Sequence, residues 1–255
     1  MKKILKKVLI LGGTGDAVKL AAQLANIPQI EVISSLAGRT KKPSALVGQV
    51  RIGGFGGAEG LANYLKENAI DFLIDVTHPC AGQITNNGAI ASQLAQIPHL
   101  MLVRTQWEKQ SGDNWIEVET VEAAAQAIPE SVKRVFITSG RQQLEPFWQR
   151  SQTYPDTWYL MRSIDPPDIE LPNSKVLLDR GPFNLEQERE LLGEYQIEAI
   201  VSKNSGGAAT YAKIIAAREL GIPIVMVQRP AMPEGEKVTS IEEAIAWLNS
   251  RLKAF

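Results

Sequence analysis

Short apolar runs alternate with longer amphipathic stretches along the first half of the chain. The first run, residues 8–11, precedes a stretch at 16–25 in which apolar side chains recur at helical spacing. The same alternation predicts strands at residues 30–34, 49–52, 72–75 and 99–103, and helices at residues 58–68 and 84–96. Strands that alternate with helices in this way are typical of a parallel, doubly wound α/β sheet.

The second half of the chain repeats this pattern at a nearly constant offset. Residues 139–140, which follow a predicted strand at 134–138, lie 127 positions after residues 12–13. Residues 197–202 lie 127 positions after residues 70–75, and both segments are predicted strands. A single offset that holds across several loops indicates an internal duplication.

The two tails of the repeat, residues 118–122 and 238–242, also share one pattern of strand, helix cap and helix. We therefore predict an α/β fold of two similar Rossmann-like parallel-sheet domains, related by internal duplication, with a cleft between them. The predicted boundary gives a dinucleotide-binding domain at residues 1–130 and a second, substrate-binding domain at residues 131–255.

Composition narrows the functional class. The 255 residues are 44% hydrophobic and 22% charged, with a net charge of -1, which favours neither nucleic acid nor a membrane as partner. The single cysteine, Cys80, excludes an internal disulfide, and with His78 and His99 it leaves no plausible metal site. We expect a cytoplasmic protein that binds small molecules, with no obligate protein partner evident.

A glycine-rich loop follows the first predicted strand. We expect its residues to bind the phosphates of a dinucleotide: Gly12, Gly13, Thr14, Gly15 and Asp16. The match to the G-x-G-x-x-G pattern is partial, because Val18 stands where the last small residue belongs. The alternative is a tight strand-to-helix turn with no ligand.

The segment after the second predicted strand indicates which nucleotide is bound. Ser34 and Ser35 stand where NAD-binding folds usually place an acid, and Arg39 and Thr40 follow soon after. Small hydroxyls beside an arginine suit a 2′-phosphate, so the predicted cofactor is NADPH, with NADH as the alternative. In the simpler interpretation, Arg39 belongs to a solvated loop.

Two further loops are candidates for cofactor contacts. Gly54 and Phe55, in the glycine-rich segment 53–57, either lie close to the cofactor or form only a turn. Thr77, His78 and Pro79 follow a strand and are expected near the nicotinamide. His78 is also the candidate catalytic residue, as a proton donor, and the alternative is a histidine that caps its loop.

The second half lacks the later glycines of the first loop and carries basic and small polar residues instead. The candidate substrate-binding residues are Gly140, Arg141, Lys203, Asn204, Ser205, Gly206, Gly207 and Arg229. Basic side chains and free backbone N–H groups before a helix are suited to anions. Together these residues predict a substrate with several carboxylates.

Several motifs, taken in order, resemble one known family, the precorrin-6A and cobalt-precorrin-6A reductases of cobalamin biosynthesis. The resemblance covers nearly the whole chain and rests on residues 11–17, 35–40, 53–57, 75–79, 181–183 and 202–207. It implies reduction of one double bond in a tetrapyrrole macrocycle by a nicotinamide nucleotide, with acetate and propionate side chains bound by the basic residues. The chain departs from the family pattern at Asp16, where a glutamate is common.

Two other functions compete with this one. A sugar-nucleotide reductase or epimerase usually carries a Tyr-x-x-x-Lys pair, but neither Tyr64 nor Tyr195 has a lysine four residues later. A non-catalytic nucleotide- or ligand-binding protein would also use two α/β lobes.

Overall fold

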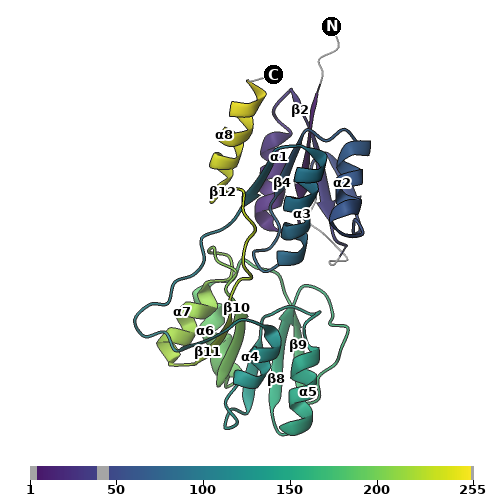
Figure 1. Cartoon of the computed structure of the whole chain (residues 1–255). Coiled ribbons are helices and arrows are strands. Elements are labelled where there is room, and N and C mark those ends of the chain that lie inside the picture. The colour runs from purple at the N-terminus through teal and green to yellow at the C-terminus, as the bar shows by residue number, and fades with distance from the viewer. Residues whose placement is uncertain (1–4, 39–45, 254–255) are drawn as a thin grey trace. The chain divides into compact units, whose positions relative to one another are not determined.

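The computed structural model describes residues 5–38 and 46–253, and the chain divides into two compact units. Unit 1 comprises Met1–Arg104 and Pro230–Phe255, and unit 2 comprises Thr105–Arg229. All strand pairs in both sheets are parallel within the described residues, and helices alternate with strands (Figure 1). The predicted fold class, two Rossmann-like α/β sheets, is therefore confirmed.

Unit 1 contains one sheet whose strands, within the described residues, follow the order β12-β5-β4-β1-β2-β3. Its elements are β1 (Lys6–Leu11), α1 (Gly15–Leu24), β2 (Ile30–Leu36), β3 (Gln49–Ile52), α2 (Gly57–Glu67), β4 (Phe72–Asp75), α3 (Gly82–Ala95), β5 (His99–Leu102), β12 (Glu236–Val238) and α8 (Ile241–Leu252). The predicted strands 49–52 and 72–75 match β3 and β4 at both ends.

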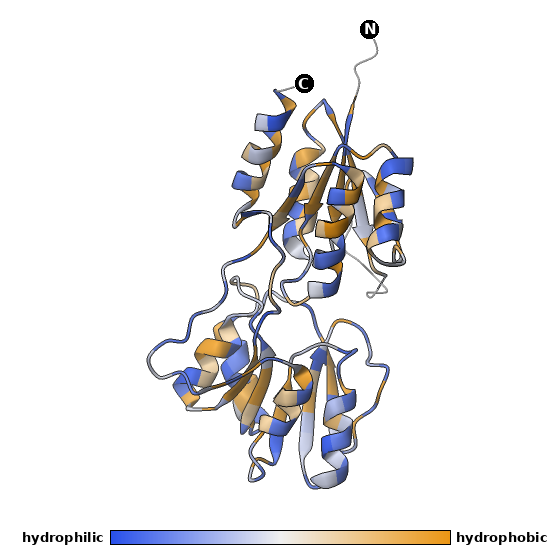
Figure 2. Cartoon of the chain, viewed as in Figure 1, coloured by the Kyte–Doolittle hydropathy of each residue, from blue (hydrophilic) through white to orange (hydrophobic). Residues whose placement is uncertain are grey.

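Different helices cover the two faces of the unit 1 sheet. Val8 and Ile10 of β1 pack with α1 and α8, whereas Leu9 and Leu11 pack with α2 and α3. This division follows from the alternation of side chains along a strand. The strands are largely orange, that is hydrophobic, in Figure 2, as expected for strands buried on both faces.

Unit 2 repeats the architecture of unit 1 with the strand order β6-β11-β10-β7-β8-β9 in its described residues. Its elements are β6 (Trp115–Val118), α4 (Val121–Ala127), β7 (Arg134–Ile137), α5 (Glu145–Thr153), β8 (Trp158–Ser163), β9 (Ser174–Leu178), α6 (Leu185–Glu194), β10 (Ala199–Lys203), α7 (Ala212–Leu220) and β11 (Ile224–Val227). One face packs on α4 and α5 and the other on α6 and α7.

The unit boundaries differ from the predicted division at residue 130. Residues 105–130 were assigned to the first domain by the sequence pattern, but β6 pairs with β11 of unit 2, with Trp115 opposite Ile224. Conversely, β12 pairs with β5 of unit 1, with Glu236 opposite Leu100. Each half of the chain therefore supplies the edge strand of the other unit's sheet.

The predicted division at residue 130 differs from the observed units because the chain is internally duplicated. The two tails are similar, so either could complete either sheet, and an apolar pattern does not state which sheet a strand joins. The helix that follows each of these strands belongs to the same unit as the strand. Helix α4 packs in the core of unit 2, and Trp247 and Leu248 of α8 pack in the core of unit 1.

No helix within the described residues is long and apolar enough to cross a membrane.

Candidate active site

The glycine-rich loop joins β1 to α1 and is held by Thr14. The Thr14 Oγ1 accepts a hydrogen bond from the Ala17 N–H at 3.2 Å, as the N-cap of α1, and donates to the Val76 carbonyl at 2.7 Å. Gly13 has a φ of 107°, and no atom lies within 4 Å of the place where a Cβ of Gly13 or Gly15 would stand. The loop thus leaves an open cradle at a helix N-terminus, which fits the phosphates of a dinucleotide.

Asp16 lies in the first turn of α1 and is paired with Arg104. The Arg104 Nε donates to Asp16 Oδ2, in an ion pair whose two side chains are about one quarter exposed. An unpaired carboxylate beside the cradle would repel a phosphate, so this pair reduces the negative charge at the predicted site. Arg104 follows the strand predicted at residues 99–103, but no local pattern indicates that it pairs with Asp16, 88 positions away.

The residues after β2 and β3 form the next part of the same sheet edge. Ser34 and Ser35 are buried, and the Ser34 Oγ has no hydrogen-bond partner among the described residues. Arg39 and Thr40 lie outside the described residues. Arg51, one strand further along, places its Nη1 3.4 Å from the Ser35 Oγ. Sequence reasoning did not select Arg51, although its position just before four glycines was a usable signal.

The segment 53–57 connects β3 to α2. The Arg51 guanidinium donates to the Gly53 carbonyl at 2.5 Å and the Gly54 carbonyl at 2.6 Å. Its carbon lies 3.7 Å from the centre of the Phe55 ring, which in turn meets Tyr64 edge-on. This loop is therefore held in shape by the Arg51 side chain.

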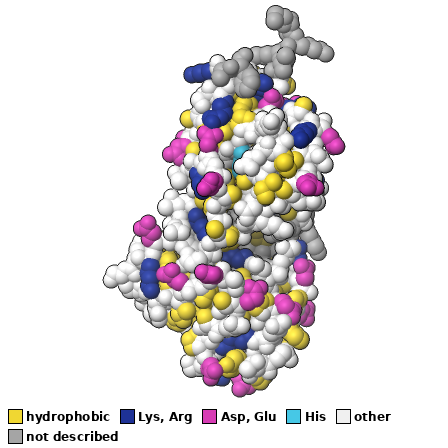
Figure 3. Space-filling model, in the orientation of Figure 1, with side chains coloured by type: hydrophobic (Ala, Val, Ile, Leu, Met, Phe, Trp, Pro, Cys, Tyr) yellow, Lys and Arg dark blue, Asp and Glu magenta, His cyan; other side chains and the backbone are white. Residues whose placement is uncertain are grey.

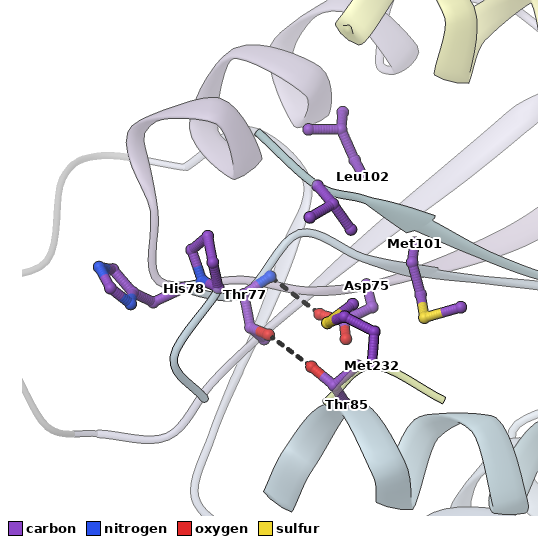
Figure 4. Close-up of a pocket in the computed structure, with 9 residues that line it drawn as sticks. Asp75, Thr77, His78, Thr85, Met101, Leu102 and Met232 are labelled. Carbon is purple, nitrogen blue, oxygen red and sulfur yellow. Dashed lines mark hydrogen bonds between the residues drawn. The ribbon is translucent and has the colours of Figure 1, made fainter. Parts of the chain in front are cut away.

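A small hollow opens at the ends of β4 and β5 of unit 1 (Figure 4). It spans about 220 Å³, a volume that includes space open to solvent, and is lined by Asp75, Thr77, His78, Pro79, Thr85, Met101, Leu102, Val103 and Met232. The buried Asp75 accepts a hydrogen bond from the Thr77 N–H at 2.8 Å, and the Thr77 and Thr85 hydroxyls lie 3.4 Å apart. Apolar walls with a few convergent polar groups are typical of small-molecule sites.

His78 rims this hollow, and its ring points away from Asp75 and Thr85 in Figure 4. The His78 Nδ1 accepts a hydrogen bond from the Cys80 N–H at 3.1 Å. A neutral His78 therefore carries its proton on Nε2, the nitrogen that faces away from this contact. This bond is the contact expected of a histidine that caps its loop.

The predicted substrate residues of unit 2 lie at the carboxyl ends of its neighbouring strands. Lys203 ends β10, and the segment after it turns through Gly206 and Gly207, whose φ values are 66° and 72°. A Cβ on Gly206 would overlap the Thr105 carbonyl oxygen and the Arg229 guanidinium. Gly206 is therefore required by a close backbone approach, and Arg229, which donates from Nε to the Asn204 carbonyl at 2.8 Å, packs against the same loop.

The Asn204 side chain faces into unit 2. It is 2% exposed, its Oδ1 accepts from the Trp107 N–H at 2.8 Å, and its Nδ2 donates to the Trp107 carbonyl at 3.0 Å. The Trp107 indole N–H donates to the Gly207 carbonyl at 2.8 Å. The hydrogen bonds between Asn204, Trp107 and Gly207 thus hold the loop 204–207 in place. Sequence reasoning missed Trp107, because nothing in a segment between repeats indicates a partner 97 positions away.

Arg141 lies in the loop after β7, next to Gly140. Its Nη1 donates to Asp168 Oδ1 at 2.6 Å and to the Pro166 carbonyl at 3.3 Å. Asp168 is well exposed, so this pair lies at the surface and is weak enough to exchange for a ligand carboxylate. The matching positive φ of Gly140, 101°, shows that the second repeat keeps the shape of the first loop without its later glycines.

A buried charged cluster lies beneath the loops of unit 2. Arg162 and Glu188 form a two-point ion pair, with Nη2 3.0 Å from Oε2, and Phe183 stacks on the guanidinium at 3.6 Å. Lys213 Nζ donates to the Thr210 carbonyl at 2.9 Å and lies 5.1 Å from the centre of the Trp107 ring. Burial, and secondarily the charge of Arg162, lowers the pKa of Lys213 to about 7.

The structure therefore gathers the described cofactor candidates at one edge of the unit 1 sheet and the substrate candidates at the corresponding edge of the unit 2 sheet. Acidic and basic side chains are interspersed over the face seen in Figure 3. Among the described residues, no group of three or more His, Cys, Asp or Glu side chains could hold a metal ion.

Comparison with known proteins points to one family. A family model described as "Precorrin-6x reductase CbiJ/CobK" matches residues 7–249. The chain is 45% identical to a precorrin-6A reductase of Rhodococcus erythropolis, over 96% of this chain and 98% of the relative. It is 39% identical to a precorrin-6A reductase of Rhodobacter capsulatus, over 95% of each chain.

A solved structure of CobK precorrin-6A reductase superposes with a TM-score of 0.88 at 38% identity, and covers 96% of this chain and 97% of the solved one. These matches span both units and the two exchanged strands. The chain belongs to the CbiJ/CobK family of precorrin-6x reductases.

Proposed function

We propose that this chain reduces one carbon–carbon double bond of the precorrin-6A macrocycle, with NADPH as reductant, in cobalamin biosynthesis. The observation that carries the proposal is the family match, which runs over both units. The open cradle that the glycine loop of unit 1 forms at a helix N-terminus supports it. The two relatives described above are named for precorrin-6A and not for cobalt-precorrin-6A, so we propose precorrin-6A as the substrate ahead of its cobalt complex.

Unit 1 supplies the proposed cofactor site. The phosphates lie against Gly13 and Gly15, where the backbone is open, and Thr14 fixes the loop to the end of β4. The hollow beside Thr77 and His78 receives the nicotinamide end. NADPH, when bound, supplies a hydride to one carbon of the reduced bond, and the protein's part is to orient the reacting groups. We infer NADPH from Ser34, Ser35 and Arg39, as the sequence predicts, with Thr40, Gly54 and Phe55 as further contacts.

Unit 2 supplies the proposed substrate site. Arg141, Lys203 and Arg229 bind carboxylates of the macrocycle, and the N–H groups of residues 205–207 add uncharged donors. Gly140 gives the first of these loops its shape, and Asn204 acts through the backbone of its own loop. Charge-assisted hydrogen bonds of this kind position a polyanion without taking part in the bond changes.

The second reduced carbon requires a proton. We propose that the imidazolium form of His78 donates it. The ring that accepts the Cys80 N–H at Nδ1 is the neutral form, so this contact opens when the ring takes up the proton that it donates. A hydride and a proton together complete the reduction of one double bond, so no metal or covalent nucleophile is needed. The cytoplasmic location predicted from the cysteine content stays a prediction.

The function is tested by anaerobic mixing of the full chain with NADPH and precorrin-6A, with nucleotide oxidation followed by absorbance. Parallel reactions with NADH and with the cobalt complex test the finer choices. Oxidation that depends on a macrocycle supports the reductase. Nucleotide binding without oxidation, with either macrocycle, would instead indicate a nucleotide-binding protein without catalysis.

The cofactor site is tested by a matched pair of variants, Gly13→Val and Gly140→Val. The two glycines occupy equivalent positions, with φ values of 107° and 101° and open space around each, so both substitutions introduce similar strain. We expect Gly13→Val to abolish NADPH binding in calorimetry, while Gly140→Val binds NADPH as the wild type does. Equal loss in both variants would refute the assignment of the nucleotide to unit 1.

A further inference from the structure

We propose that Arg51 selects the 2′-phosphate of the nucleotide, an inference that rests on the proposed function. Arg51 is the third residue of β3 and stands directly opposite Ser35 of β2 in the sheet register. In dinucleotide-binding folds, the residue that reads the adenosine ribose lies near the end of the second strand, and an arginine nearby accommodates a 2′-phosphate. Arg51 stands at that edge, within the described part of the chain.

The guanidinium is already oriented before any ligand binds. Bonds to the Gly53 and Gly54 carbonyls hold it at 2.5 and 2.6 Å, and the Phe55 ring lies 3.7 Å below its carbon atom. A cation stacked on an aromatic face and bonded at two nitrogens has lost most of its rotational freedom. An anion that binds there costs little further side-chain entropy.

The charge of Arg51 has no acidic partner among the described residues. Several other arginines of the described residues form an ion pair with a carboxylate, as Arg162 does with Glu188. Arg51 differs from them in this respect. A guanidinium has five N–H groups. Two donate to the carbonyls and a third faces Ser35, which leaves the Nε–H and one Nη2–H as adjacent donors for a phosphate.

The loop that carries these groups also leaves room for a nucleotide. No atom lies within 4 Å of a Cβ built on Gly53, Gly54, Gly56 or Gly57, so the space beside the loop is open. Positive φ values of 124°, 79° and 95° account for glycine at Gly53, Gly56 and Gly57. Helix α2 begins at Gly57, and its N-cap Gly56 offers no side-chain hydrogen bond. By contrast, a Cβ on Gly60 would overlap the Phe55 carbonyl oxygen, so the loop is held tightly against α2 on one side and open on the other.

The test compares nucleotide affinities of the full chain by calorimetry. Arg51→Ala is expected to weaken NADPH binding roughly ten- to a hundredfold, the value of a charge-assisted hydrogen bond, and to leave NADH affinity within about threefold. The fragments 2′,5′-ADP and 5′-AMP should show the same contrast. Arg51→Lys keeps the charge without the planar fork, so it should give a smaller loss.

A matched control is Arg134→Ala. Arg134 in unit 2 also stacks on an aromatic ring, Trp158 at 4.4 Å, and donates to a carbonyl, that of Tyr195, at 2.5 Å. Its removal should leave both nucleotide affinities unchanged. Arg39→Ala tests the arginine that the sequence favours.

Each outcome decides the matter. A selective loss of NADPH in Arg51→Ala supports the inference. Equal loss of both nucleotides, which would make Arg51 only a clamp on its loop, overturns it, as does an unchanged NADPH affinity. A wild type that prefers NADH, or an effect confined to Arg39→Ala, overturns this inference and leaves the reductase intact. A wild type that binds neither nucleotide overturns the proposed function as well.

Discussion

Substitution of Asn204 by alanine isolates the contact that holds the unit 2 loop. In the wild type, Asn204 satisfies both the N–H and the carbonyl of Trp107, at 2.8 and 3.0 Å, in a position that is 2% exposed. Alanine removes both partners at once, and water has little access to replace them. The variant therefore buries two backbone groups without hydrogen bonds.

Each unsatisfied buried group costs about 1–3 kcal/mol, so Asn204→Ala, which leaves two such groups, should lose about 2–6 kcal/mol of unfolding free energy. A loss of 3 kcal/mol lowers the melting temperature by roughly 6–12 °C in a protein of this size. Asn26→Ala is the matched control, because Asn26 is exposed and its side chain donates to the carbonyl of Ala22 in the preceding helix α1. The control should stay within about 0.5 kcal/mol of the wild type.

The assay combines urea denaturation with hydrogen exchange at the Trp107 amide. The wild-type amide is protected by the Asn204 Oδ1, and the variant amide should exchange much faster. If Asn204→Ala unfolds at the wild-type midpoint and protects this amide equally, the reasoning is refuted. Unchanged stability with a raised KM for the macrocycle would mean that the side chain contacts substrate instead.

Two further predictions concern the buried charges of unit 2. Burial lowers the pKa of Lys213 from 10.5 to about 7, so above pH 7 the unfolded chain binds more protons than the native one, and this contribution to stability rises with pH from about 7 to about 10. Lys213→Met should flatten that rise in denaturation curves measured across this range, and an identical slope in both proteins would contradict the lowered pKa. Arg162→Met leaves Glu188 buried without its partner and should cost about 3–5 kcal/mol, whereas the double variant Arg162→Met/Glu188→Leu should recover much of the loss. A double variant no more stable than the single one in urea would show that the lost ion pair is not the cause.

The sequence predicts the fold well where a local pattern determines it. The alternating run 49–52 lies between Gly48 and Gly53, and the apolar run 72–74 lies between Asp71 and Asp75, so the predicted ends coincide with those of β3 and β4. The duplication could be recognised because strand ends and the loops that follow them recur at an offset of 127 residues. The predicted boundary at residue 130 differs from the boundaries of the two units, because no local feature of β6 and β12 indicates which sheet each strand joins.

The candidate site could be predicted only in part. Glycines, basic residues and the family resemblance indicate which loops matter, because parallel strands bring their carboxyl ends to one edge. Side-chain partners are set by tertiary contacts that no local pattern records. Two examples are the hydrogen bonds between Asn204 and Trp107 and the ion pair between Asp16 and Arg104. Arg51 was not selected from the sequence because its partners include backbone carbonyls, which no residue type indicates.

Because β6 and β12 are exchanged between the two halves of the chain, neither half contains all the strands of its own sheet. Unit 2 is one continuous segment, Thr105–Arg229, whereas unit 1 is assembled from two segments that are separated by the whole of unit 2. A protease cut between the two halves at residue 130 would leave each fragment without the strand and helix that complete its own sheet, so the fragments would have to reassociate to fold. The same arrangement results when two copies of a single-domain ancestor swap their last strand and helix in a dimer and are then fused end to end.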